Sequence, residues 1–207
     1  MYLPKHFSME TEGAIGIISE FPFATLITID QDGLPFANHI PMLAERLPNG
    51  SIKLLGHLAR RNPQWVHFRG NQSVLAIFNG PHSYITPSWY VSGRDVPTWN
   101  YAVVHASGPV KLIEDFDGLT DILKKMTARF ESGPRRWEFE LPDDLTDASA
   151  LTSAIVGFEL LAEKIDAKFK LSQNRSKEDQ QGVVEGLSER TDEMSRMVRS
   201  LMIRGQK

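Results

Sequence analysis

Short apolar segments separated by tight turn signals restrict the fold of this chain more than any other feature. The β-branched run FATLITI at 23–29 is followed by the turn DQDG and then by LPFANHIPMLAE, and a second turn, PNG, precedes SIKLLGHL at 51–58. Connections this short join antiparallel neighbours, because a parallel pair needs a crossover of a dozen or more residues. We therefore predict a hairpin over 23–44, a third strand over 51–58 and an antiparallel meander.

Helical patterns alternate with further strand patterns along the chain. Apolar residues recur at helical spacing between Met9 and Glu20, and again in FDGLTDILKKMTARFES at 116–132. Asn62 and Pro63 are suited to begin a short helix. More strands are expected in QSVLAIFNG, in TWNYAVVHASGPVKLIE with its Gly-Pro interruption, and in IVGFELLAEKIDAKFKLS. About six strands predict a mainly β fold with flanking helices, a small barrel; a two-layer α+β sandwich is the alternative.

The segments after the second helix suggest a tail. Residues 133–150 read as loop and turns, and the chain from Ser176 is charged and helical. A stripe of apolar residues within it (Met194, Met197, Val198 and Leu201) would pack on the body or on a second subunit. We expect one domain over residues 1–175 and a helical tail over 176–207.

Composition excludes several classes of protein. The 207 residues contain no cysteine, so disulfides and thiolate metal sites are excluded. The start, MYLPKHFSMETEG, lacks the apolar core of a signal peptide, and no apolar run approaches a membrane span, which predicts a cytoplasmic protein.

Charge and histidine spacing bear on nucleic-acid and metal binding. The net charge of −3 lacks the excess of basic residues that binding to nucleic-acid phosphates usually requires. The six histidines show no ligand spacing, so we expect no metal, although a site assembled from separate strands stays open.

Three polar or aromatic segments are candidates for binding. GHLARRNP would place free N–H groups and Arg60 and Arg61 at a helix start, which suits a phosphate; two arginines on a solvated loop are the alternative. PSWYVSGRDVPTWNY at 87–101 holds four of the chain's eight Trp and Tyr rings and could frame a flat ligand or form an ordinary sheet corner. KFKLSQNRS at 168–176 could present donors to an anionic ligand or simply cap the tail helix. No residue stands out as a catalytic acid, base or nucleophile.

Taken together, MYLPKHF, NHIPM, GHLARRNPQW, GPHSYITPSWY, VPTWNYAVVHASG and KFKLSQNRS resemble the PaiB-type family of FMN-binding negative transcriptional regulators. The resemblance runs from residue 1 to about residue 187. It implies the FMN-binding split β-barrel, a homodimer with the flavin between subunits, and repression of genes for degradative enzyme synthesis and sporulation.

The resemblance also implies a set of cofactor-binding residues. The phosphate would lie at Gly56, His57, Arg60 and Asn62, and the isoalloxazine near Asn38, His39 and Ile40. The pocket would be walled by Trp99, Asn100 and Tyr101, and reached from the neighbouring subunit by Gln173 and Arg175. Gly93, Arg94 and Asp95 would turn the chain beside the slot.

Three functions are compatible with a bound flavin. The first is a homodimeric repressor that acts on DNA or through another regulator. The second is a flavin-dependent oxidoreductase that reduces a small substrate with a nicotinamide donor, and the third is a flavin-storage or interaction module without turnover. The missing basic balance disfavours direct DNA binding.

Overall fold

The computed structural model describes residues 1–70, 73–93, 96–140, 144, 149–150 and 152–205. The chain forms two compact units, each built from separate segments. The first contains Met1–Phe21, Phe78–His105 and Ile165–Lys207, and the second contains Pro22–Ile77 and Ala106–Lys164. The two longest strands contribute residues to both units.

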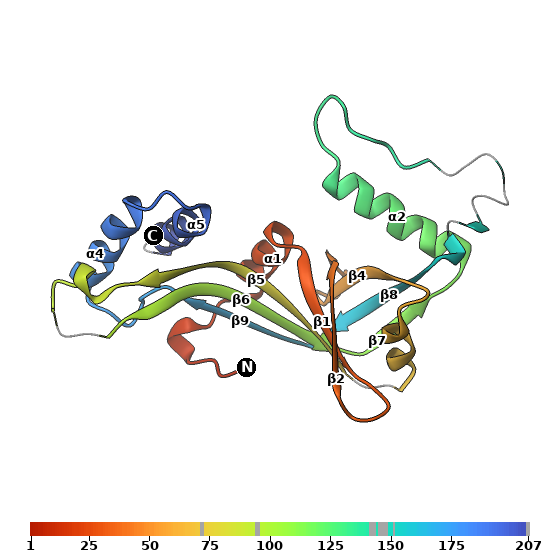
Figure 1. Ribbon diagram of the computed structural model, residues 1–207, viewed down its shortest axis with the longest axis horizontal. Coiled ribbons are helices and arrows are strands. Elements are labelled where there is room, and N and C mark those ends of the chain that lie inside the picture. The colour runs from red at the N-terminus through yellow and green to blue at the C-terminus, as the bar shows by residue number, and fades with distance from the viewer. Residues whose placement is uncertain (71–72, 94–95, 141–143, 145–148, 151, 206–207) are drawn as a thin grey trace. The chain divides into compact units, whose positions relative to one another are not determined.

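The second unit begins with the predicted hairpin. Strand β1 (Phe23–Ile29) pairs antiparallel along its whole length with β2 (Pro35–Pro41), and its other edge pairs with the start of β5. The turn is closed by the Asp30 carboxylate, which accepts hydrogen bonds from the backbone N–H groups of Asp32 and Leu34. Both β1 and β2 are labelled in Figure 1.

A four-stranded sheet completes the second unit, in the order β3-β4-β8-β7. Its strands are β3 (Leu43–Arg46), β4 (Ile52–Ala59), β7 (Val110–Ile113) and β8 (Ile155–Ala162). Helix α2 (Phe116–Phe130) lies beside β4 and β8 (Figure 1). It buries Leu119, Ile122 and Met126 against Ile113. The 3-10 helix η2 (Pro63–Gly70) follows β4, where a short helix is predicted.

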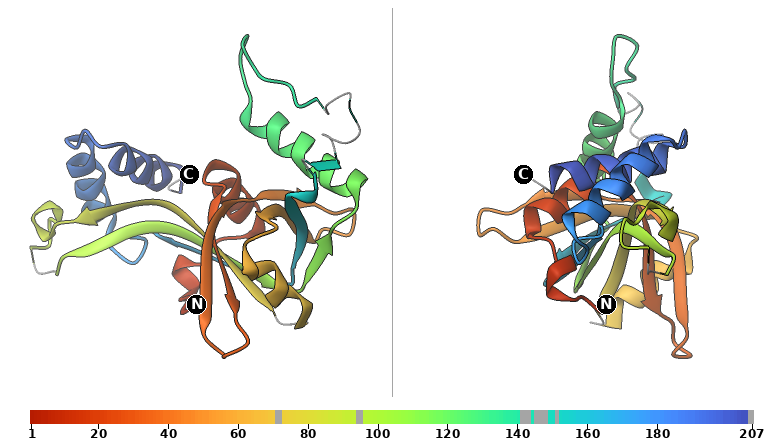
Figure 2. Two further views of the ribbon diagram at one scale, coloured as in Figure 1. Left: turned by 45° about the vertical axis from the view of Figure 1, so that its right-hand side comes forward. Right: turned by 90° about the vertical axis from the view of Figure 1, so that its left-hand side faces the viewer.

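The first unit is built on the strand order β5-β6-β9. These strands are β5 (Val74–Ile85), β6 (Thr98–Gly108) and β9 (Lys164–Lys170). Four helices accompany them in the described part of the unit: η1 (Lys5–Phe7), α1 (Thr11–Glu20), α4 (Lys177–Ser188) and α5 (Glu193–Arg204), with the short turn η3 (Pro87–Trp89). Figure 2 shows α4 and α5 side by side.

The helical tail packs on the strands of its own unit. Ser195 of α5 hydrogen-bonds Ser83 of β5 at 2.9 Å, and both side chains are buried. Each helix is capped at its start, α4 by Ser176 and α5 by Asp192, whose side chains accept a backbone N–H three residues on. The expected tail is therefore two capped helices joined by a short turn.

The predicted mainly β, antiparallel fold with flanking helices is confirmed, with more strands than the six expected. Nine strands occur in the described residues. The surplus of three arises where one apolar run holds two strands: Met42 separates β2 from β3, Pro109 separates β6 from β7, and Glu163 separates β8 from β9. Because proline cannot donate to a sheet ladder, β6 ends before Pro109.

Candidate functional site

Asn38 and Asn62 hydrogen-bond each other and share a partner, Gln64, that sequence reasoning missed. The Asn38 amide donates to Asn62 Oδ1 at 3.3 Å and to Gln64 Oε1 at 2.9 Å. Gln64 is fully buried, and its Nε2 donates to the backbone oxygens of Leu26 and Phe36. Asn62 Oδ1 also accepts the backbone N–H of Gln64 at 3.0 Å. These amides fix the start of η2 onto the β1–β2 hairpin, so the predicted Asn62 cap is formed.

The predicted ring-binding residues of β2 point to opposite sides of the strand. Ile40 is buried, whereas His39 is exposed and stacks on the exposed ring of Phe23 with centroids 6.3 Å apart. This arrangement results from the two-residue repeat of a strand, which sends neighbouring side chains to opposite faces. Of the predicted trio, Asn38 and Ile40 share one face of β2 and His39 has the other.

Gly56 and His57 both serve the packing of the second unit. A Cβ atom added at Gly56 would lie 2.8 Å from the Phe158 ring on the paired strand β8. His57 faces the other way, and its Nδ1 lies 3.3 Å from the sulfur of Met126 on α2. Burial lowers the pKa of His57, because desolvation disfavours the imidazolium.

The Arg60 guanidinium is held by its own unit. Its Nε and Nη2 donate to the backbone oxygens of Ser153 and Ile155, each at 3.0 Å, and Nη1 lies 2.8 Å from a Glu114 carboxylate oxygen. Arg61, next in the chain, is exposed, and it has no ion pair or hydrogen bond within the described part of the protein. The two adjacent arginines thus differ: the Arg60 guanidinium is bonded to groups of its own unit, and the exposed Arg61 guanidinium is accessible to a ligand.

The first unit carries an exposed aromatic cluster, formed by Trp99 of β6 and by His82 and Tyr84 of β5. The Trp99 ring is 52% exposed; its centroid lies 5.9 Å from that of Tyr84, edge-on, and 6.1 Å from that of His82. Large rings are normally buried in soluble proteins, so an open indole supported by two further rings is suited to stack on a ligand or a partner.

Lysines of β9 lie beside this face of β6. The Lys168 ammonium lies 5.5 Å from the centroid of the Tyr101 ring. Lys170 donates to the Trp99 backbone oxygen at 2.8 Å and to the Thr98 hydroxyl. Burial lowers the pKa of Lys170, and the charges of Lys168 and Arg175 act in the same direction. Trp99 and Tyr101 therefore share one face of β6, where the Lys168 ammonium lies over the Tyr101 ring.

Asn100, between those two rings, points into the core of the first unit. It is fully buried, and its amide donates to Ser172 Oγ at 3.0 Å and contacts the Met202 sulfur at 3.6 Å. Ser172 has a φ of 64°, a left-handed conformation that is rare outside glycine. Asn100 thus connects β6 to the turn between β9 and α4.

Gln173 and Arg175 have internal partners. The Gln173 amide accepts the Leu171 N–H at 2.7 Å and donates to the Phe169 carbonyl. The Arg175 guanidinium lies 5.1 Å from the centroid of the buried Tyr90 ring. Part of the aromatic stretch is therefore structural. Arg94 and Asp95, expected to turn the chain there, lie outside the described residues.

The twelve predicted cofactor residues divide between the units. Seven belong to the second unit and five to the first: Asn38, His39, Ile40, Gly56, His57, Arg60 and Asn62, and then Trp99, Asn100, Tyr101, Gln173 and Arg175. Three residues that sequence reasoning did not assign to the site each contact a predicted residue of their own unit: Gln64, His82 and Ser172. A single buried glutamine after Asn-Pro carries no signal of its burial in the sequence.

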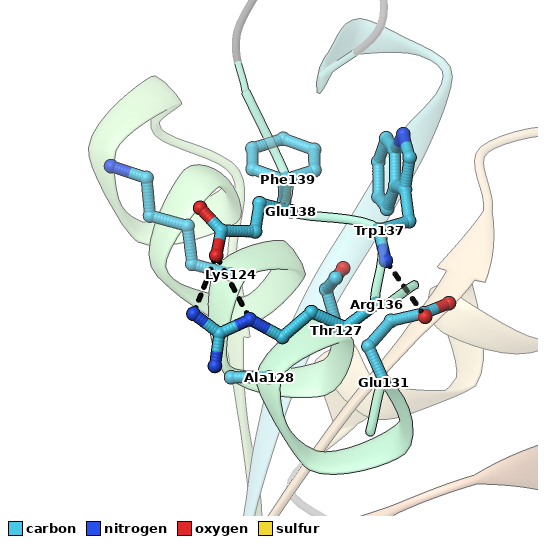
Figure 3. Close-up of a pocket in the computed structure, with 8 residues that line it drawn as sticks. All are labelled: Lys124, Thr127, Ala128, Glu131, Arg136, Trp137, Glu138 and Phe139. Carbon is cyan, nitrogen blue, oxygen red and sulfur yellow. Dashed lines mark hydrogen bonds and ion pairs between the residues drawn. The ribbon is translucent and has the colours of Figure 1, made fainter. Parts of the chain in front are cut away.

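A cavity of 320 Å³ lies between α2 and residues 136–139 (Figure 3). Its Arg136 pairs with Glu138, and Glu131 accepts the Trp137 N–H, as the dashed lines show. Outside the undescribed gaps, no group of three or more His, Asp or Glu is placed to hold a metal, and no described helix has the length and apolarity to cross a bilayer.

Comparison with known proteins adds a family. Residues 1–164 match the family model described as "Putative FMN-binding domain". The chain is 36% identical over 206 residues to the Protease synthase and sporulation protein PAI 2 of Bacillus subtilis, covering 98% of this chain and 96% of that protein. It is 31% identical to the uncharacterized protein YKL070W of Saccharomyces cerevisiae, covering 63% and 90%. The predicted resemblance is confirmed.

Solved structures share the fold at low sequence identity. The flavocytochrome Anf3 of Azotobacter vinelandii has a TM-score of 0.61 at 16% identity, with 77% of this chain and 67% of that chain covered. The FAD and heme binding protein of Mycobacterium smegmatis has a TM-score of 0.61 at 17% identity, with 80% and 74% covered. These likenesses confirm the expected split-barrel fold.

Proposed function

Because the chain belongs to the family described as "Putative FMN-binding domain", we propose that it is an FMN-binding, PaiB-like repressor that works as a homodimer. FMN supplies redox chemistry when bound, and the protein supplies the surfaces that hold it. The observation that carries the proposal is the open indole of Trp99 with Tyr84 and His82 around it.

Each unit, taken by itself, carries residues that suit one part of FMN. In the first unit the exposed Trp99 offers a flat apolar face to the isoalloxazine, and the Lys168 ammonium, which lies over the Tyr101 ring, suits the carbonyl-rich edge. The exposed Arg61, just before η2, suits the phosphate. Arg60 has a different part in this proposal: its bonds to Ser153, Ile155 and Glu114 fix the backbone from which Arg61 extends.

Magnitudes show that a single cation is not enough to hold FMN. Micromolar affinity needs about 8 kcal/mol, whereas one charge-assisted hydrogen bond contributes roughly 1.5–3 kcal/mol. Stacking on an exposed ring and burial of the tricycle must supply the remainder. A homodimer brings more surface to one flavin, with Gln173 and Arg175 as contacts from the neighbouring subunit. Gln173 would first have to release the Phe169 and Leu171 backbone.

A role in regulation is supported by the relative whose name refers to protease synthase and sporulation, and repression by the resemblance of the sequence to the family of negative transcriptional regulators. With a net charge of −3 and no basic face evident in the sequence, action through a partner protein suits the chain better than direct DNA binding. Flavin turnover with a nicotinamide donor is a separate activity, measured by NADH oxidation in the presence of added FMN and an acceptor.

Quenching of FMN fluorescence on titration with protein tests the cofactor site. Trp99→Ala should weaken binding about tenfold, from the loss of stacking and buried area. Trp137→Ala is the matched control, because Trp137 is 58% exposed but lies in the other unit beside α2. Equal affinity of the Trp99 and Trp137 variants would exclude the aromatic cluster from the site.

Two further measurements separate the remaining parts of the proposal. Light scattering with and without FMN tests the dimer, and a monomer that retains FMN contradicts a shared site. Transcript levels in a strain lacking the protein, restored with either the native chain or the Trp99→Ala variant, test repression. Unchanged transcripts on deletion would refute repression while leaving FMN binding intact.

A further inference from the structure

A second cavity lies in the first unit, away from the residues assigned to FMN stacking. It measures 350 Å³ and is bounded by the end of β9, the last turns of α5, the first turns of α4 and the segment before α1. Its walls are largely apolar, formed by Met9, Phe169, Leu171, Leu201 and Met202. This size is within the range of small-molecule sites, which are typically about 300–1,000 Å³.

The polar groups of this cavity are mostly occupied. The Gln173 amide is bonded through both of its polar atoms to the Phe169 and Leu171 backbone, and Gln180 Nε2 donates to the Arg175 carbonyl at 2.9 Å. A neutral polar ligand would thus find few free side-chain donors. Apolar walls with satisfied amides favour a ligand whose inserted part is a hydrocarbon.

Arg204 is the exception among the lining residues. Its side chain is exposed, and within residues 1–205, leaving aside the undescribed positions, it has no ion pair or hydrogen bond. A wider groove shares Gln173, Gln180 and Gly205 with the cavity and adds Lys177, whose ammonium is likewise exposed and unpaired there, and Glu178. Two cations against one carboxylate leave a net positive charge around the opening.

From this juxtaposition we infer that the cavity binds an amphipathic carboxylate, with its hydrocarbon part against Leu201 and Met202 and its carboxylate at Arg204. The hydrocarbon gains from leaving water, and the guanidinium offers paired donors that match a carboxylate. The site would make the protein responsive to an anionic small molecule, which goes beyond the proposed binding of FMN.

The cavity also borders the turn at Ser172, which joins β9 to α4. Leu171 and Gln173 flank Ser172, which has the left-handed φ of 64° and hydrogen-bonds Asn100. Met202, a wall residue, contacts the same Asn100 amide. A ligand against Leu171 and Met202 therefore touches the residues that hold Asn100, which lies between Trp99 and Tyr101 in β6.

Isothermal titration of the full chain with decanoate below its micellar concentration, and with decanol as the neutral counterpart, tests the proposal. We expect saturable decanoate binding, about fivefold tighter than decanol, because an exposed ion pair contributes a modest free energy. Arg204→Gln should abolish this preference. Arg196→Gln, an exposed cation of the same helix that does not line the cavity, should leave it unchanged.

A blocking variant tests the cavity itself. Leu201→Trp should fill it and weaken decanoate binding roughly tenfold or more, with circular dichroism checking the fold. If that variant does not fold, the Arg204→Gln comparison still decides. Equal affinity for decanol and decanoate, no effect of Arg204→Gln, or undiminished binding in a folded Leu201→Trp protein would each overturn the assignment. All titrations are made without FMN, so the proposed flavin site can fail independently.

Discussion

Gly186 of α4 lies directly against the indole of Trp89, so that a Cβ atom at this glycine would meet the ring at 2.2 Å. One turn earlier, a Cβ atom at Gly182 would lie 2.1 Å from the Trp89 carbonyl oxygen. The Arg190 guanidinium covers the same ring, 5.1 Å from its centroid. Two glycines spaced one helical turn apart thus let α4 approach the turn η3, and Trp89 anchors the helical tail rather than a ligand.

We expect Gly186→Ala to destabilise the protein by about 1–3 kcal/mol, since the added methyl group overpacks the Trp89 contact and outweighs the gain in helix propensity. Gly16→Ala in α1 is the matched control, because nothing lies within 4 Å of its added Cβ; it should stabilise by about 0.5–1 kcal/mol. Urea unfolding measures both. Equal shifts in the two variants would contradict the close contact.

Variants of the two adjacent arginines should differ in effect: loss of Arg60 should lower stability, and loss of Arg61 should lower the affinity for FMN. Arg60→Ala should lower the unfolding midpoint, because it strips partners from the Ser153 and Ile155 carbonyls and from Glu114. Arg61→Ala should leave that midpoint unchanged and weaken FMN binding about tenfold. Arg135→Ala serves as a control for removal of an exposed arginine. If only Arg60→Ala weakens FMN binding while stability is unchanged, the assignment to Arg61 is wrong.

His57 should make stability depend on pH. Its pKa in the folded protein is lowered by burial, so the unfolded chain binds the proton more readily. The free energy of unfolding should therefore be unaffected by this group above the unfolded pKa of about 6.5, and should fall as the pH drops from there towards the folded pKa. The pKa of His105 is also lowered by burial and acts in the same direction.

Replacing His57 should thus make the free energy of unfolding depend less steeply on pH, while His105 keeps part of the dependence. His57→Leu tests the effect by urea unfolding at several pH values between about 4.5 and 8, a range chosen to bracket the unfolded value. Met126→Leu retains the burial and should retain the slope, although it removes the sulfur contact. If the stability of His57→Leu depends on pH as steeply as that of the native protein, His57 does not cause the dependence.

Ser172 combines an unfavourable backbone conformation with a buried hydrogen bond. Ser172→Ala should cost about 1–3 kcal/mol, since the Asn100 amide loses a partner in the core. Ser172→Gly loses the same bond but relieves the left-handed φ, which favours glycine by roughly 1 kcal/mol. We expect the glycine variant to be the more stable of the two in thermal unfolding. The reverse order would exclude backbone strain at this turn.

Local patterns predicted most of the elements. The alternation in FATLITI and the DQDG turn are sufficient for the β1–β2 hairpin, because a tight turn fixes the register of the strands beside it. Helix α2 is predicted by its apolar repeat, and the Gly108-Pro109 break between β6 and β7 by proline chemistry. These features depend on residues close in the sequence.

The site was harder to predict because it depends on which face of a strand a residue occupies. Trp99 and Asn100 are neighbours in the sequence, yet the Trp99 side chain is exposed and the Asn100 side chain is buried. Arg60 looks like a free cation in GHLARRNP, but its partners Glu114, Ser153 and Ile155 are more than fifty residues away. Gln64 contacts Asn38, Leu26 and Phe36 in the same way, through distant partners that no local pattern encodes.

The stretch that matches the family ends at residue 164, yet the first unit also requires residues beyond it. Most of strand β9 and the anchored helix α4 lie after that point. In a protein shortened there, β6 would become an unpaired edge strand, and Trp89 and Asn100 would lose their contacts with α4 and Ser172. Unpaired edge strands promote edge-to-edge aggregation. The family model therefore ends before the folded unit does, although the Bacillus subtilis relative matches the chain over 206 residues, and a version shortened for expression should keep the residues up to the end of α5.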